Sequence, residues 1–108
     1  MRLVVIESPY AGNVDRNLRY LRACLRDSLM RGEAPFASHA LYTQPGVLDD
    51  GVPEERRHGI EAGFAWRRRA DAVVFYVDLG ISRGMEEALA RAAQEGLTTE
   101  HRFLGGAW

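Results

Sequence analysis

The stretch Val4-Val5-Ile6-Glu7-Ser8-Pro9-Tyr10-Ala11-Gly12-Asn13 decides the expected fold. A continuous apolar run from Leu3 to Ile6, rich in β-branched residues, is typical of a parallel strand that is buried on both faces. A short polar turn follows this strand and leads into a long amphipathic segment. In an open parallel sheet, ligands bind outside the carboxyl ends of the strands. We therefore expect this turn to form one half of a binding site.

The segment from about Asn13 to Arg31 has the pattern of an amphipathic helix. Its apolar residues recur at steps of three and four and so mark one face, namely Val14, Leu18, Leu21, Leu25 and Leu29. Asn13 is expected to cap the first turn, and Gly32 to end the helix. The opposite face carries arginines, which are expected to be solvated.

Further along the chain, strand and helix patterns alternate. The remaining elements are expected as a strand at 34–38, an irregular stretch at 39–52, a helix from Pro53 to about 69, a strand at 72–77, a helix at about 83–95 and a strand at about 99–104. This order predicts an α/β fold with a four-stranded parallel sheet covered by helices on both faces. Right-handed crossovers favour the strand order 2-1-3-4.

Length and composition narrow the possible classes of function. A chain of 108 residues corresponds to one domain, residues 1–108. The formal net charge of −1, with arginines spread along the chain, predicts no nucleic-acid partner. No run approaches the roughly 20 apolar residues of a membrane span, and no signal peptide is recognisable, so we expect no membrane partner and a cytoplasmic location.

Several side chains invite a functional interpretation but have a plainer structural one. Cys24 and Trp66 are expected in the core, and the run Arg67 to Arg69 is expected to extend its charges into solvent at a helix end. Asp49 and Asp50 shape the irregular stretch or line a pocket. The histidines lack metal-ligand spacing and are expected to be structural or solvated: His39, His58 and His101. There is also no P-loop, so neither a metal nor a cofactor is predicted.

A second turn, from Asp78 to Gly84, follows the strand at 72–77. With the order 2-1-3-4, this strand is the neighbour of the first one, so the two turns lie side by side. Each turn precedes a helix N-terminus, whose free N–H groups and dipole favour an anion. Ser8 and Ser82 could donate to phosphate oxygens, Tyr10 could stack on a base or ribose, and Asp78 could accept from sugar hydroxyls. The alternative is that Ser82 is an ordinary helix cap and the glycines only serve tight turns.

The chain resembles a family of small uncharacterised phage and bacterial domains related to the nucleoside 2-deoxyribosyltransferases. The matching motifs occur in order over nearly the whole chain: Glu7 to Gly12, Arg16-Asn17, Arg31 to Pro35, His39 to Tyr42, Leu48 to Asp50, Glu55-Arg56, Gly59 to Gly63 and Gly80 to Met85. The resemblance implies a flavodoxin-like fold and a pocket for a nucleotide or nucleoside-like molecule. It also implies a homo-oligomer, because the related enzymes complete their pockets with a neighbouring subunit.

In the related enzymes, a glutamate four residues after the glycine of the second turn attacks the anomeric carbon. Here that glycine matches Gly84, and the fourth residue after it is Ala88. Glu87 lies one position away, and each residue turns a helix by about 100°, so Glu87 is out of register with the nucleophile. A local shift of the turn could restore Glu87, and Glu61 on the preceding helix could also face the pocket.

Three hypotheses follow for the function. The first is binding of a nucleotide-derived molecule without turnover, for example by a phage protein that sequesters a nucleotide signal of host immunity. The second is a nucleoside deoxyribosyltransferase or nucleotide N-glycosidase that uses Glu87 or Glu61. The third is a protein-interaction module with an arginine-rich helical surface. For the first two, the expected ligand-binding residues are Ser8, Pro9, Tyr10, Gly12, Asn13, Tyr42, Asp78, Gly80, Ser82, Gly84 and Met85.

Overall fold

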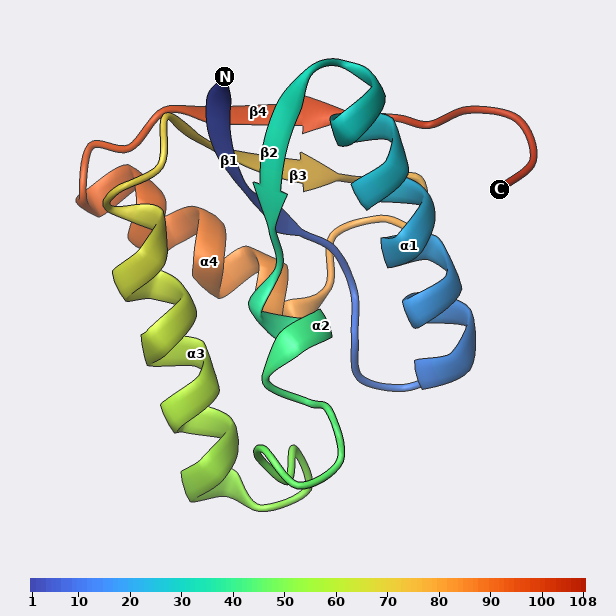
Figure 1. Cartoon of the computed structure of the whole chain (residues 1–108). Coiled ribbons are helices and arrows are strands. Elements are labelled where there is room, and N and C mark those ends of the chain that lie inside the picture. Colours follow the sequence, from blue (N-terminus) through green and yellow to red (C-terminus); the bar gives the residue numbers. More distant parts are fainter.

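Four parallel strands form one sheet at the centre of the computed structural model, which describes residues 1–108 (Figure 1). Their order is β2-β1-β3-β4, as the sequence predicts. The strands are β1 (Arg2–Glu7), β2 (Glu33–Phe36), β3 (Ala72–Tyr76) and β4 (Thr99–Arg102). The helices are α1 (Val14–Met30), α2 (Ser38–Leu41), α3 (Pro53–Arg67) and α4 (Arg83–Gln94). No helix is both long enough and apolar enough to cross a membrane.

Helices cover both faces of the sheet, with α1 on one side and α3 and α4 on the other (Figure 1). Side chains of β3 alternate between two cores, because successive residues of a strand point to opposite faces. Val74 and Tyr76 pack in the core beneath α1, whereas Val73 and Phe75 pack with Phe64 of α3. All five residues of β3 are buried. In β1, for which burial on both faces was predicted, Val4, Val5 and Ile6 are buried, but Leu3 is 49% exposed.

The buried face of α1 agrees in part with the predicted one. Leu21 is buried and Leu18 and Leu25 pack against the same core, as expected, but Leu29 is 54% exposed. The other buried residues of the helix are Asn17, Tyr20, Cys24 and Ser28. Polar side chains take these positions because their hydrogen bonds are made inside the fold. The Asn17 amide, for example, donates to the carbonyl of Tyr10 at 2.8 Å. The structure confirms the bounds of the helix, with the Asn13 side chain accepting from the N–H of Arg16.

The stretch 39–52 was predicted to be irregular, but the helix α2 occupies its start. Strand β2 ends at Phe36, two residues earlier than expected, and the chain turns into α2 at Ser38. This helix packs against α3, where Gly63 allows a close approach. A Cβ atom at Gly63 would lie 2.7 Å from the Ser38 hydroxyl oxygen.

Two predictions about individual side chains are wrong. Trp66 was expected in the core, but it is 54% exposed and its ring lies 5.2 Å from that of Phe36. Arg67 was expected to reach solvent, but it is 1% exposed. Its guanidinium donates to the carbonyl of Ala88 at 2.8 Å, pairs with Glu95 at 3.3 Å and lies over the ring of Phe64. These contacts offset part of the cost of burying the charge, but the Nε atom has no hydrogen-bond partner.

The chain beyond β4 folds back over the sheet edge toward α1. The carboxylate of Asp78 accepts hydrogen bonds from the N–H groups of Leu104 and Gly105 and from the Tyr20 hydroxyl. The ring of Trp108 then lies 4.7 Å from that of Tyr20. The predicted last strand therefore ends at Arg102 and continues as a tail held by side chains.

Candidate functional site

A pocket of about 530 Å³ lies at the carboxyl end of β1, between α2, α3 and the N-terminus of α4. Residues from both predicted turns line it, with Ser8, Tyr10 and Gly12 on one side and Ser82, Gly84 and Met85 on the other. Its volume falls in the range of small-molecule sites. A more open groove of about 700 Å³ adjoins the pocket at Tyr10 and Asp50, but it contains no residue of the second turn. The less open pocket, which both turns line, is therefore the candidate site.

The first turn is held in place by the start of α1. Gly12 has a φ of 96°, which a residue with a side chain rarely adopts. The Asn17 side chain donates to the carbonyls of Tyr10 and Ala11, so the turn has a fixed shape. Pro9 and Asn13 belong to the same turn but do not line the pocket. Pro9 is buried in the protein, and the Asn13 side chain caps α1.

The second turn presents a helix N-terminus to the pocket. The Ser82 hydroxyl accepts from the N–H of Met85 at 3.2 Å, which confirms Ser82 as the cap of α4. The N–H groups of Arg83 and Gly84 have no acceptor within the chain, as expected for the first residues of a helix. Gly80 forms the turn with a φ of 84° and lies outside the pocket. Asp78, expected to bind sugar hydroxyls, also lies outside because it holds the C-terminal tail.

The two carboxylates suggested as nucleophiles have different positions. Glu87 lines the pocket and accepts a hydrogen bond from Arg57 at 3.1 Å. Glu61 lies outside the lining and pairs with Arg91 at 3.1 Å, also with Arg57 at 3.4 Å. Ala88, the fourth residue after Gly84, lines the pocket with a methyl group. Glu61 is therefore no longer a candidate for chemistry in this pocket.

Glu7 is a pocket residue that the sequence analysis did not select. As the last residue of β1 it points to the same face as Val5 two residues earlier, which is the face covered by α3 and α4. Its carboxyl group makes no hydrogen bond within the chain, and Phe64 and Met85 line the same pocket. Burial raises the pKa of Glu7 to about 7, although the positive charge of Arg67 acts in the opposite direction. A charged residue directly after a buried apolar run was the signal that could have identified it.

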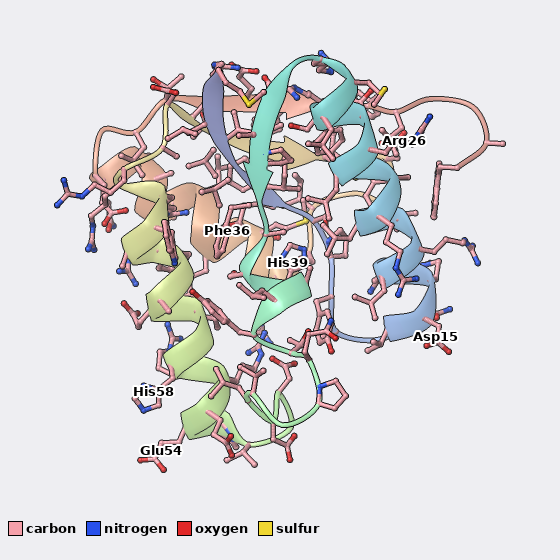
Figure 2. All side chains as sticks on the ribbon, in the orientation of Figure 1. Asp15, Arg26, Phe36, His39, Glu54 and His58 are labelled. Carbon is pink, nitrogen blue, oxygen red and sulfur yellow. The ribbon has the colours of Figure 1, made fainter.

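His39, which was expected to be structural or solvated, also lines the pocket. Its Nε2 atom lies 2.8 Å from the Ser8 hydroxyl oxygen, and burial lowers the pKa of the imidazole to about 4. The ring is therefore neutral near pH 7 and orients the Ser8 hydroxyl in the pocket. Figure 2 shows His39 on α2 between α1 and α3, whereas His58 points outward from α3. The motif from His39 to Tyr42 was the signal that pointed to this residue, but α2, which places His39 at the pocket, was not predicted.

The long stretch before α3 closes one side of the pocket. Asp50 lines the pocket and lies 3.7 Å from the Arg56 guanidinium, which also lines it. Asp50 thus takes the second of its two predicted roles. Tyr42 lies instead at a smaller adjoining cavity, and its hydroxyl accepts from the Trp66 indole at 3.0 Å. Arg83 is exposed at the rim and forms no ion pair. The structure places no group of three or more potential metal ligands together.

A protein-family model matches most of the chain. The model of a protein family described as "Domain of unknown function (DUF7768)" matches residues 2–102. This range covers every helix and strand, including all the pocket residues. No curated protein matches the chain.

Proposed function

The chain belongs to this family of unknown function, and we propose that it binds a nucleotide-derived small molecule in the pocket at the end of β1, without turnover. The observation that carries the proposal is that both strand-to-helix turns line a single pocket. Neighbouring strand ends in a parallel sheet are where such ligands bind in other α/β proteins. The resemblance to nucleoside 2-deoxyribosyltransferases supports the same class of ligand.

The pocket offers different chemistry at its two ends. The unpaired N–H groups of Arg83 and Gly84, together with the Arg83 side chain, suit a phosphate group. Tyr10, at the border with the open groove, offers an aromatic ring for a base. A molecule with a phosphate at one end and a flat ring at the other, such as a nucleotide, fits this arrangement.

Absence of turnover is proposed because position 88 holds an alanine. A methyl group cannot attack an anomeric carbon, so the covalent step of the related enzymes has no nucleophile at that position. The alternative is a nucleotide N-glycosidase that uses Glu87, which is favoured by the place of Glu87 in the pocket lining. In that case free base would form from a nucleoside 5′-monophosphate, and Glu87→Gln would abolish its release.

Calorimetry tests the proposal with nucleoside 5′-monophosphates, ADP-ribose and cyclic nucleotides as probes. At least one probe should bind more tightly than about 1 mM and remain intact by chromatography. Gly84→Leu should reduce this affinity at least tenfold, because a Cβ at Gly84 meets no atom within 4 Å and the added side chain occupies ligand space. Ala93→Leu, at an exposed site on the same helix, is the matched control and should leave binding unchanged. Absence of binding by every probe contradicts the proposal.

A further inference from the structure

Glu7 is the carboxyl group in the pocket that has neither a hydrogen-bond partner nor an ion-pair partner in the chain. The other two carboxylates of the lining are paired, Glu87 with Arg57 at 3.1 Å and Asp50 with Arg56 at 3.7 Å. A partly buried carboxyl group without a partner is costly to the fold, and this cost is recovered when a ligand supplies donors.

The position of Glu7 indicates which part of a nucleotide it would meet. Glu7 ends β1 and lies in register with Phe75 of β3, the strand whose exit leads to the cap of α4. If a phosphate group of the ligand binds at the N-terminus of α4, the part of the ligand next to that phosphate therefore lies against the end of β1. In a nucleoside monophosphate, the group next to the phosphate is the sugar.

The role of sugar-binding carboxylate was expected at Asp78, which also follows a strand. Asp78 is engaged by Tyr20, Leu104 and Gly105 on the other side of the sheet. Glu7 is the strand-end carboxyl group that remains available in the pocket. Carboxylates at strand ends recognise ribose hydroxyls in dinucleotide-binding α/β proteins, because one carboxylate accepts from two adjacent O–H groups.

We propose that Glu7 binds the 2′ and 3′ hydroxyls of the ligand's sugar and that the pocket therefore selects a ribonucleotide over its 2′-deoxy counterpart. This inference rests on the proposed nucleotide binding and adds the class of sugar. The Ser8 hydroxyl, held by His39, lies beside Glu7 in the chain and completes a polar strip along the apolar wall formed by Phe64 and Met85. A 2′-deoxy ligand would leave one Glu7 oxygen without a donor.

The test compares the four ribonucleoside 5′-monophosphates with their 2′-deoxy counterparts by calorimetry at pH 8, where Glu7 is mostly ionised. A ribonucleotide that binds the wild-type protein should bind at least tenfold more tightly than its deoxy form, as expected for one hydrogen bond to a charged group. In Glu7→Gln, this ratio should fall to about threefold or less, because the amide has one acceptor oxygen, and the deoxy form, which keeps only the 3′ hydroxyl, should lose less affinity than the ribo form. Because Glu7 bonds to no group of the chain, the variant should fold, and circular dichroism checks this.

Glu86→Gln is the matched control, since Glu86 is exposed on α4 and lies outside the pocket, and it should keep the wild-type ratio. Equal affinity of the wild-type protein for ribo and deoxy forms would overturn the inference and leave the proposed function standing. A Glu7→Gln variant that weakens both forms equally would also overturn it, because Glu7 would then contact the phosphate or the base. If neither form of any nucleotide binds, the proposed function itself fails.

Discussion

Glu7 places a carboxyl group in the pocket that Phe64 and Met85 line, and this affects stability as well as binding. Its pKa is about 7 in the folded protein, against 4.5 for the ordinary group. The folded state therefore holds a proton that the unfolded state releases between these two pH values. Below about pH 4.5, Glu7 is protonated in both states and its ionisation does not affect the free energy of unfolding. As the pH rises to 7, ionisation of the buried group destabilises the folded state, and this effect is fully present above pH 7.

We expect Glu7→Gln to stabilise the protein at pH 8 by roughly 1–3 kcal/mol and to leave its stability nearly unchanged at pH 4.5. The amide is neutral at both pH values, so the variant avoids the desolvation of a charge. Urea unfolding at the two pH values measures the difference. A stabilisation of the same size at both would show that ionisation is not its cause.

At the scale of elements, the contact between α2 and α3 determines where His39 lies. Gly63 lies against Ser38, the residue before His39, and a Cβ atom there would be 2.9 Å from the Ser38 Cβ. Such a distance forces one of the two helices to move. The short helix α2, which makes few contacts of its own, is held at the pocket by this close approach.

We expect Gly63→Ala to destabilise the protein by about 1–3 kcal/mol through overpacking, as measured by urea unfolding. Gly84→Ala is the matched comparison, because the same added methyl group on α4 meets open space. It should be neutral or stabilise the helix by up to about 1 kcal/mol. Equal stability of the two variants would mean that α2 adjusts freely and that the close approach is not required.

Across the whole molecule, a buried polar network beneath α1 connects the two edge strands of the sheet. Glu33 of β2 accepts from Arg102 of β4 at 2.7 Å and from the Ser28 hydroxyl of α1 at 2.8 Å. Arg102 also donates to the Tyr76 hydroxyl at 3.2 Å. These hydrogen bonds, those from Arg102 above all, lower the pKa of Glu33 to about 2. Every element that meets at this point contributes a partner, so the buried charges are compensated.

The depressed pKa of Glu33 predicts a loss of stability in acid. Its contribution is fully present above about pH 4.5 and disappears as the pH falls through about 2. Glu33→Gln should therefore cost roughly 3 kcal/mol at pH 7, where it leaves the Arg102 charge without its main partner, and much less near pH 2. Urea unfolding measures both values. Glu54→Gln, at an exposed site on α3, should change stability little at either pH, and a pH-independent loss in Glu33→Gln would contradict the assignment.

The pattern of apolar residues was sufficient to predict the sheet, its strand order and three of the four helices. The period of apolar residues reports local structure, and the crossover rule converts the order of elements into a topology. The same pattern did not predict the burial of Asn17, Tyr20 and Ser28 on α1 or the exposure of Leu29. These residues are buried because groups outside the helix bond to their side chains, five to seven residues away for Asn17 and Ser28 and at Asp78 for Tyr20. The period of apolar residues contains no information about such partners.

The sequence by itself determined that two strand-to-helix turns meet at one edge of a parallel sheet, and it determined that the fourth residue after Gly84 is an alanine. Only the tertiary structure decided which polar side chains of those turns are available. Asp78 and Glu7 both follow apolar strands, but the C-terminal tail occupies Asp78, whereas Glu7 opens into the pocket without a partner. The sequence places both carboxyl groups at the ends of strands. Contacts between distant segments decide whether such a carboxyl group already has a hydrogen-bond partner. The availability of Glu7 is therefore a property of the fold.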